Sequence, residues 1–386
     1  MAVVRLSRRT LDLTDSPIGL AYDLVGLREG PVLDLAQAAP QYPAAEAVVE
    51  HIVRVARDTR GGTYTEVPGL PHLRTLFAAE LRRDYRGVVG ADDVVVTAGC
   101  NQAFSVVASA LAGPGDEVIL PLPYYFNHDM WLRITGVRPV YLEPGPDLVP
   151  RAADAEALIT PRTRAIVLVT PGNPSGVTVG PAEVAAFADV ARRHDVALIL
   201  DETYRSFRDT DEPAHRLFAE PGWRETVVSL HSFSKDFAIP GYRVGAVVAG
   251  PELNREVCKL LDCVAICAPR VGQEAAWAGL THAGAWRAER ARSIAEQRAW
   301  FAEAMTARPG GFELLSCGGF FGWVRHPFTD RPTVDVVRDL VVKHGVLVIP
   351  GTAFLPDDRR MLRVSVSNAD RASITTLAER LARAGA

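Results

Sequence analysis

Short apolar runs alternate with amphipathic stretches along much of this chain, and this alternation limits the possible folds more than any other feature. The runs are rich in Val, Ile and Leu, and they lie at 93–97, 117–120, 165–169, 197–200, 227–230 and 244–248. The stretch 181–193 begins with Pro and repeats its apolar residues at helical spacing, and 101–111 also reads as a helix. Continuous apolar strands separated by helices are typical of a parallel sheet covered on both faces. We therefore predict an α/β fold with a mainly parallel sheet sandwiched by helices.

The pattern changes near the C-terminus, where a charged helical stretch at 286–306 precedes a second group of elements. This group comprises apolar strands at 320–324, 346–349 and 362–366 around a helix at 334–344. A chain of 386 residues is long enough for two domains. We predict a large α/β domain over 45–285 and a smaller α+β domain built from both termini, 1–44 plus 286–386.

Charge and composition narrow the classes of partner. A net charge of -4 gives no electrostatic basis for binding nucleic acid or an acidic membrane surface. No apolar run approaches the roughly 18 residues that a membrane span needs. The five cysteines are odd in number and lack the paired spacing of zinc sites. We expect a cytoplasmic, reduced protein with no metal, no nucleic-acid partner and no membrane partner.

Lysine is almost absent from the chain, and one copy lies in an unusual setting. Lys and Arg together number 42, but the only lysines are Lys235, Lys259 and Lys343. A lysine amine can lose its proton and form an imine, which arginine cannot do. Lys235 follows Ser232 and Ser234 and precedes Arg243, residue types that bind phosphate. An aldehyde-reactive amine beside a phosphate cradle indicates pyridoxal phosphate; a solvated surface lysine is the alternative reading.

Polar residues also follow other predicted strands, at the edge where parallel sheets bind ligands. Gly99, Cys100 and Asn101 open a helix, where backbone N–H groups and the helix dipole favour an anion such as phosphate. Asn173 lies in a Pro- and Gly-rich turn from which its amide can donate a hydrogen bond. From each motif alone, an ordinary turn remains an open alternative.

Two charged residues lie in strongly apolar strand patterns, where a charge is costly unless it is paired. Asp201 ends such a strand and is followed by Tyr204. It either caps the next element or keeps a pyridine nitrogen protonated, with Tyr204 near the ring hydroxyl. Arg363 lies inside another apolar strand, which suggests either a substrate carboxylate or a structural ion pair.

Taken together and in this order, these groups resemble the fold type I enzymes that use pyridoxal phosphate. Within that group they look like the class I/II aminotransferase family, which is aspartate aminotransferase-like. The resemblance spans residues 30–370, and its most specific part is the signature S-x-S-K-x5-G-x-R-x-G at 232–245. It implies that Lys235 is the Schiff-base lysine and the proton carrier. It also implies that Asp201 pairs with the pyridine nitrogen, and that Asn173 and Tyr204 contact the ring hydroxyl.

The resemblance assigns further contacts to the cofactor and the substrate. It implies a phosphate cup with the members Gly99, Cys100, Asn101, Ser232, Ser234 and Arg243. Tyr125 matches an aromatic ring stacked on the cofactor, and Tyr64 matches a tyrosine that reaches the phosphate of a partner subunit. This last match implies a homodimer with shared active sites. Arg363 matches the residue that binds the substrate α-carboxylate, with Asn173 and Ala38 close to it.

Three departures from the family pattern bear on the substrate rather than the cofactor. The segment Leu35-Ala36-Gln37-Ala38-Ala39-Pro40 has Ala where the family usually has Gly, so added methyl groups reshape the substrate pocket. Asn101 stands where many relatives have Lys. Ile239-Pro240 replaces a commoner Met-Thr pair.

The sequence therefore predicts transfer of an amino group between an L-amino acid and an α-keto acid. A lyase, decarboxylase or cyclase acting on an amino acid in specialised metabolism would use the same residues and stays open. A regulatory module that binds the cofactor without turnover is a third reading, against which the full set of catalytic groups argues. For the substrate side chain, His128 or Arg133 would suit an acidic group. Candidates for an aromatic wall are Tyr22, Tyr124, Phe126, Phe320 and Phe321.

Overall fold

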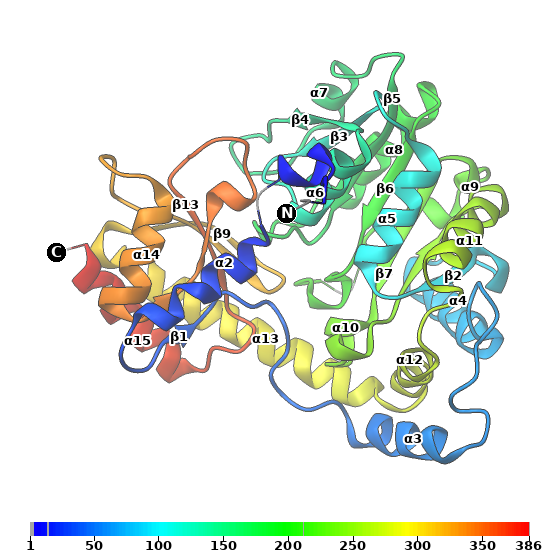
Figure 1. Cartoon of the computed structure of the whole chain (residues 1–386), viewed down its shortest axis with the longest axis horizontal. Coiled ribbons are helices and arrows are strands. Elements are labelled where there is room, and N and C mark those ends of the chain that lie inside the picture. Colours follow the sequence, from blue (N-terminus) through cyan, green and yellow to red (C-terminus); the bar gives the residue numbers. More distant parts are fainter. Residues whose placement is uncertain (1–3, 14, 211, 386) are drawn as a thin grey trace.

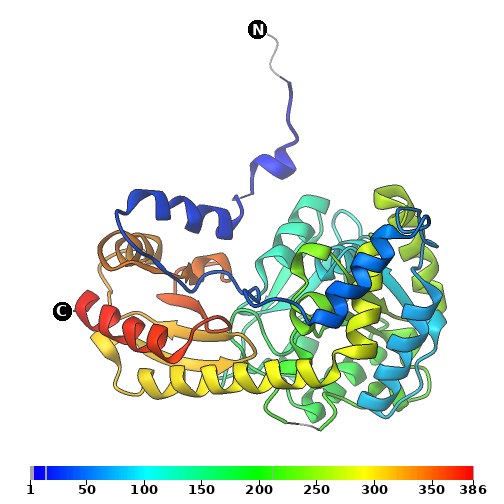
Figure 2. The same cartoon turned by 90° about the horizontal axis from the view of Figure 1, so that it is seen from below.

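The computed structural model describes residues 4–13, 15–210 and 212–385. Figure 1 shows a large sheet flanked by helices and, beside it, a smaller group of strands and helices coloured orange to red. The long helix α13 (Gly284–Met305) runs beneath both parts in Figure 2. Among the described helices, none is both long and apolar enough to cross a membrane.

The large sheet has seven strands in the order β2-β8-β7-β6-β5-β3-β4. They are β2 (Val94–Thr97), β3 (Glu117–Pro121), β4 (Arg138–Leu142), β5 (Thr163–Val169), β6 (Ala197–Asp201), β7 (Val227–Ser232) and β8 (Gly245–Val248). All neighbours pair in parallel except β8, which is antiparallel to both β2 and β7. The predicted α/β fold with a mainly parallel sheet is confirmed, and the reversed β8 is a feature that apolar periodicity does not reveal.

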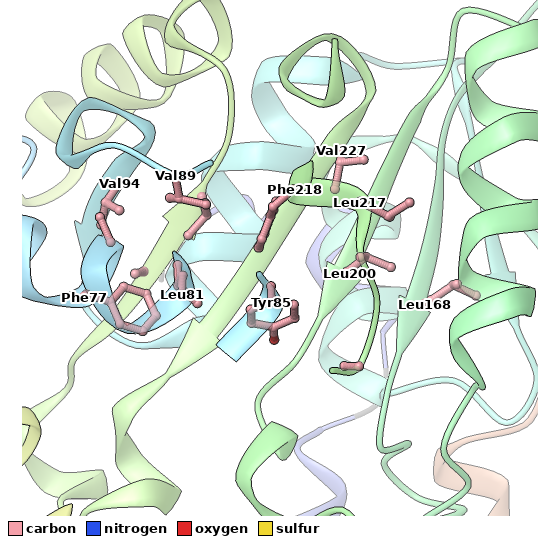
Figure 3. Close-up of a cluster of buried hydrophobic side chains, with 14 of the residues drawn as sticks. Phe77, Leu81, Tyr85, Val89, Val94, Leu168, Leu200, Leu217, Phe218 and Val227 are labelled. Carbon is pink, nitrogen blue, oxygen red and sulfur yellow. The ribbon is translucent and has the colours of Figure 1, made fainter. Parts of the chain in front are cut away.

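Both faces of this sheet are buried, which explains why its strands are continuously apolar. In β6, Leu198 and Leu200 point into one core cluster and Ile199 into another, because successive strand residues face opposite sides. The first cluster, part of which is shown in Figure 3, contains side chains of several helices. The longer ones are α3 (Glu46–Arg57), α4 (Pro71–Tyr85), α8 (Pro181–Arg193) and α12 (Arg270–His282). The second contains side chains of α5 (Cys100–Leu111), α6 (Phe126–Thr135) and α11 (Pro251–Ala265).

The smaller sheet is antiparallel and has the order β12-β13-β10-β9. Its strands are β9 (Glu313–Gly318), β10 (Phe321–Arg325), β12 (Ile349–Pro350) and β13 (Met361–Ser365). Phe301 of α13 packs in one core with side chains of α14 (Thr333–His344) and α15 (Arg371–Ala384). Beside it, β1 (Leu33–Asp34) pairs in parallel with β11 (Val346–Leu347).

This pairing joins the N-terminal segment to the C-terminal part of the chain. On this basis we propose the division into 45–285 and 1–44 plus 286–386 that the sequence suggests. The remaining described helices are short: α1 (Arg8–Leu11), α2 (Pro17–Asp23), α7 (Ala152–Glu156), α9 (Trp223–Thr226) and α10 (Phe233–Asp236).

One predicted strand needs correction. The run 346–349 is not a single strand, because β11 bonds to β1 whereas β12 bonds to β13, with Val348 between them. Its two halves therefore belong to different sheets.

Candidate active site

The carboxyl ends of β5, β6 and β7 open onto a cavity that also receives residues from both ends of the chain. The residues lining this cavity are Ile18, Gln37, Ala38, Cys100, Asn101, Tyr125, Phe126, Val169, Asn173, Asp201, Thr203, Tyr204, Ser232, Ser234, Lys235, Pro240, Arg243 and Arg363. Parallel strands place the loops at their carboxyl ends together, so residues far apart in sequence meet here. Of the residues that the sequence assigns to catalysis, to the cofactor or to the substrate α-carboxylate, all but Gly99 and Tyr64 line the cavity.

Lys235 lies in α10, the short helix that directly follows β7. The hydroxyl of Ser232 caps this helix by accepting a hydrogen bond from the backbone N–H of Ser234 at 3.2 Å. The Lys235 amine donates a hydrogen bond to the Ala38 carbonyl at 2.6 Å. Burial, with the nearby charges of Arg363 and Arg243, lowers the pKa of Lys235 to about 8. The amine is therefore far easier to deprotonate than an ordinary lysine, which suits it to act as a nucleophile and a base.

Asp201 ends β6 with only 4% of its surface exposed, and it is held as an anion by three neighbours. His128 Nε2 lies 3.3 Å from one carboxylate oxygen. The Thr203 backbone N–H donates to the other oxygen at 3.0 Å, and the Cys100 thiol lies 3.5 Å from it. Burial alone would raise the pKa of Asp201, but the hydrogen bond and charge of His128 and the bonds from Thr203 hold that pKa below its ordinary value. Asp201 can therefore stabilise a positive charge facing it in the cavity.

His128 does not lie where the sequence placed it as a candidate for binding an acidic substrate. It is 2% exposed, it stacks on Phe104 with 3.9 Å between ring centroids, and it points at Asp201. Arg133 is likewise engaged, because it donates to Asp129 at 2.8 Å and to the Tyr141 hydroxyl at 2.6 Å. Neither side chain lines the cavity.

Arg363 projects from β13 as a buried guanidinium without a carboxylate partner among the described residues. It donates to Asn173 Oδ1 at 3.1 Å and to the Ala36 carbonyl at 2.5 Å, whereas its Nε has no partner. Its Cζ lies 5.1 Å from the Phe321 ring centroid and 5.0 Å from that of Phe354. Burial lowers the pKa of Arg363 to about 10. A buried cation of this kind favours an anionic ligand, whereas the alternative of a structural ion pair finds no support in the residues described.

The start of α5 and the segment after α10 form a cradle of hydrogen-bond donors. Arg243 has a left-handed backbone, with φ of 50°, and its guanidinium bonds to the carbonyls of Pro240 at 2.9 Å and Ala98 at 3.3 Å. Gly99 caps α5 with φ of 85°, and a Cβ at Gly99 would collide with the Arg243 guanidinium. Glycine is thus required for the cation to approach the helix N-terminus, an arrangement that favours phosphate.

The three tyrosines that the resemblance assigns to the cofactor have different environments. Tyr125 lines the cavity, and its hydroxyl donates to Asn101 Oδ1 at 3.3 Å. Tyr204 is buried against the Phe320 and Phe321 rings, and its hydroxyl makes no hydrogen bond to the residues described. Tyr64 is 73% exposed and lies outside its own chain's cavity, where its carbonyl accepts a bond from Arg270 at 3.2 Å.

Several cavity residues were not found from sequence. Thr203 and Gln37 lie close in sequence to Asp201 and Ala38, which were predicted, and this proximity was the only sequence signal for them. Ile18 comes from α2, far from any motif. Of the proposed aromatic wall, only Phe126 lines the cavity; Tyr22 bonds to Asp34, Tyr124 stacks on Tyr141, and Phe320 and Phe321 are buried behind Tyr204.

Comparison with known proteins agrees with this arrangement. A family model described as aminotransferase class I and II matches residues 30–381. An aromatic aminotransferase of Arabidopsis thaliana is 31% identical, with 97% of this chain and 95% of the relative covered. An arginine–pyruvate transaminase of Pseudomonas aeruginosa is 32% identical over 82% of this chain and 81% of its own. Among solved structures, Thermus thermophilus aspartate aminotransferase with maleate has a TM-score of 0.89 at 27% identity, covering 99% of this chain and 100% of that one.

Proposed function

The chain belongs to the class I and II aminotransferases, which transfer amino groups with pyridoxal phosphate, and on this premise we propose a role for each group in the cavity. The observation that carries the proposal is a buried amine of lowered pKa, Lys235, within a cavity that holds both a phosphate cradle and a buried carboxylate. Lys235 is the residue that bonds covalently to the cofactor. The substrates are an L-amino acid and an α-keto acid.

The residues present fit the cofactor. Because Gly99 has no Cβ, the Arg243 guanidinium can lie against the start of α5, and the hydroxyls of Ser232 and Ser234 add donors for the phosphate. Asp201, as a buried anion, would hold the pyridine nitrogen in its protonated form. The Tyr204 hydroxyl and the Asn173 amide would bind the ring hydroxyl, and Tyr125 would stack on the ring.

Bound pyridoxal phosphate supplies an electron sink for the carbanion formed at the substrate Cα. The protein supplies the charges and the proton carrier. Arg363 binds the substrate α-carboxylate, which places the Cα–H bond near Lys235. The Lys235 amine then accepts the Cα proton, a task for which a pKa of about 8 is well matched to neutral conditions.

We also propose that the active enzyme is a homodimer, and that Tyr64 reaches the site of the partner subunit. The Tyr64 side chain is exposed and does not line the cavity of its own chain. Large apolar side chains are exposed on nearby elements, at Val49 and Val53 of α3 and at Val264 and Ile266 around the end of α11. Such surfaces are typical of protein interfaces. Five free cysteines support a reduced, cytoplasmic location.

Separate replacement of Lys235 and of Lys259 tests the proposal that Lys235 bonds to the cofactor and carries the proton. Lys235→Ala should abolish covalent attachment of the cofactor and lower amino transfer by at least about a thousandfold, because both the amine nucleophile and the proton carrier are lost. Lys259→Ala is the matched control, since Lys259 pairs with Glu256 on the surface at 2.7 Å. Cofactor attachment is read by borohydride reduction and mass spectrometry, and transfer by keto-acid formation. Normal transfer by Lys235→Ala would refute the assignment.

A further inference from the structure

The cavity carries three cationic side chains, and the reaction common to all amino acids already uses each of them. Arg243 belongs to the phosphate cradle, Lys235 to the cofactor and the Cα proton, and Arg363 to the α-carboxylate. The two arginines are also fixed by hydrogen bonds to neighbouring carbonyls and to Asn173. A second carboxylate on a substrate would find no remaining cation among the lining residues that the structure describes.

One other lining residue is charged, Asp201, and as an anion it would repel a second carboxylate. The rest of the lining is uncharged and includes Ile18, Gln37, Asn101, Phe126 and Thr203. The two candidate cations from the sequence, His128 and Arg133, are engaged with Asp201 and with Asp129, and neither belongs to the cavity lining. Among the groups that this chain contributes to the site, an acidic side chain leaves its charge unpaired, which is costly in a partly desolvated site.

Gln37 lies next to the two residues whose carbonyls bind Arg363 and Lys235. The Arg363 guanidinium donates to the carbonyl of Ala36, and the Lys235 amine donates to the carbonyl of Ala38. Gln37 lies between these two residues in the chain, so its backbone lies between the carbonyls that meet the Arg363 guanidinium and the Lys235 amine. An amino acid carries its carboxylate and its reacting nitrogen on one Cα, so a substrate held by Arg363 and Lys235 has its Cα near this segment. The Gln37 side chain is exposed, lines the cavity and bonds to no described residue.

We infer that this enzyme selects amino acids with uncharged side chains, and that Gln37 contacts the substrate side chain and sets that selectivity. The inference rests on the proposed function, because it assumes that Arg363 and Lys235 hold the substrate as described. A neutral amide accepts apolar and polar uncharged groups, and it cannot neutralise a carboxylate.

The test compares amino donors in wild-type holoenzyme and in two arginine variants. Leucine, methionine, phenylalanine and glutamine serve as uncharged donors, and aspartate and glutamate as acidic donors. In the wild type, kcat/KM for the best uncharged donor should exceed that for either acidic donor by roughly 100-fold. Gln37→Arg should raise kcat/KM for acidic donors roughly tenfold or more and lower it for uncharged donors. Gln41→Arg makes the same change in the same segment but outside the cavity lining, and it should leave both values unchanged.

The outcomes separate this inference from the proposed function. A wild type that prefers aspartate or glutamate overturns the inference and leaves the aminotransferase assignment intact. A holoenzyme with covalently bound cofactor that converts none of the six donors overturns the proposed function instead. If Gln37→Arg leaves the ratio of kcat/KM for acidic donors to kcat/KM for uncharged donors unchanged, Gln37 does not set the selectivity. Gln37→Leu provides a second measurement, in which preference for leucine over glutamine should increase.

Discussion

At the scale of single residues, the candidate site is defined by buried ionisable groups that lack a full partner of opposite charge among the residues described. Asp201 receives enough hydrogen bonds to remain an anion, yet among the described residues its only ion-pair partner is a histidine. Arg363 has hydrogen bonds to neutral oxygens but no carboxylate within the described part of the chain. Lys235 is held beside two guanidinium groups that disfavour its own charge. Each group therefore gains from a ligand of defined charge.

The lowered pKa of Lys235 predicts how attachment of the cofactor depends on pH. Only the neutral amine attacks an aldehyde, and the amine is protonated below a pKa of about 8. The attachment rate of the apoenzyme should rise about tenfold per pH unit below pH 8 and level off above it. Stopped-flow absorbance with excess cofactor, from pH 6 to 10, measures this profile.

A variant of Arg363 provides the control for this profile. Arg363→Met removes one positive neighbour of Lys235, so the midpoint should move to higher pH. A wild-type midpoint near the ordinary lysine value of about 10.4 would contradict the environment described for this amine.

At the scale of elements, the site depends on the close approach of β8 to the start of α5. Gly245, the first residue of β8, lies against backbone atoms on two sides. A Cβ there would lie 2.7 Å from the Gly99 carbonyl carbon, 2.7 Å from the His231 carbonyl oxygen and 2.8 Å from the Cys100 nitrogen. The antiparallel β8 thus brings Arg243, two residues before it, to the helix N-terminus that is proposed to bind phosphate.

This packing predicts different effects for two alanine substitutions in one signature segment. Gly245→Ala should destabilise the protein by about 1–3 kcal/mol, because backbone atoms must move to admit the methyl group. It should also weaken cofactor retention. Gly241→Ala is the control, since no atom lies within 4 Å of the added Cβ. Urea unfolding of the apoenzyme and equilibrium dialysis of the cofactor measure the two effects; equal unfolding free energies for the two variants would contradict the packing argument.

At the scale of the whole molecule, the cavity lies where the two sheets and the N-terminal segment meet. The large sheet contributes the groups proposed for the cofactor, such as Asp201 and Lys235. The smaller sheet contributes Arg363, and the N-terminal segment contributes Ile18 and Gln37. The residues proposed for cofactor binding and those proposed for substrate selection therefore belong to different parts of the chain. The substrate-binding residues can differ in another sequence while the cofactor-binding residues stay the same.

The proposed dimer predicts complementation between two defective subunits. Lys235→Ala lacks the reacting amine, and Tyr64→Ala lacks the side chain proposed to reach the partner's site. When the two variants are unfolded and refolded together, mixed dimers should contain one intact site each, restoring about a quarter of wild-type sites in a statistical mixture. Keto-acid formation and sedimentation analysis measure this recovery. Activity no higher than the mean of the separate variants would contradict site sharing.

The sequence predicted the central strands well because their apolar runs are continuous. Ala165–Val169 and Ala197–Leu200 lie within β5 and β6. The edge strand β4 was not predicted, since Arg138–Leu142 includes Pro139 and is only partly buried. The direction of β8 and the division of the run 346–349 depend on which strand each segment pairs with. Such pairing is a non-local property that hydrophobic periodicity does not contain.

By itself, the sequence determined the chemical types available and their placement at strand ends, because parallel strands bring the following residues to one edge. The motifs alone therefore predict Lys235, Asp201, Asn173 and Arg243 as site residues. Only the tertiary structure decided that His128 serves Asp201 rather than a substrate, and that Gln37 lies between the partners of Arg363 and Lys235. These contacts join segments far apart in the chain, so they follow from how the elements pack rather than from any local pattern of residues.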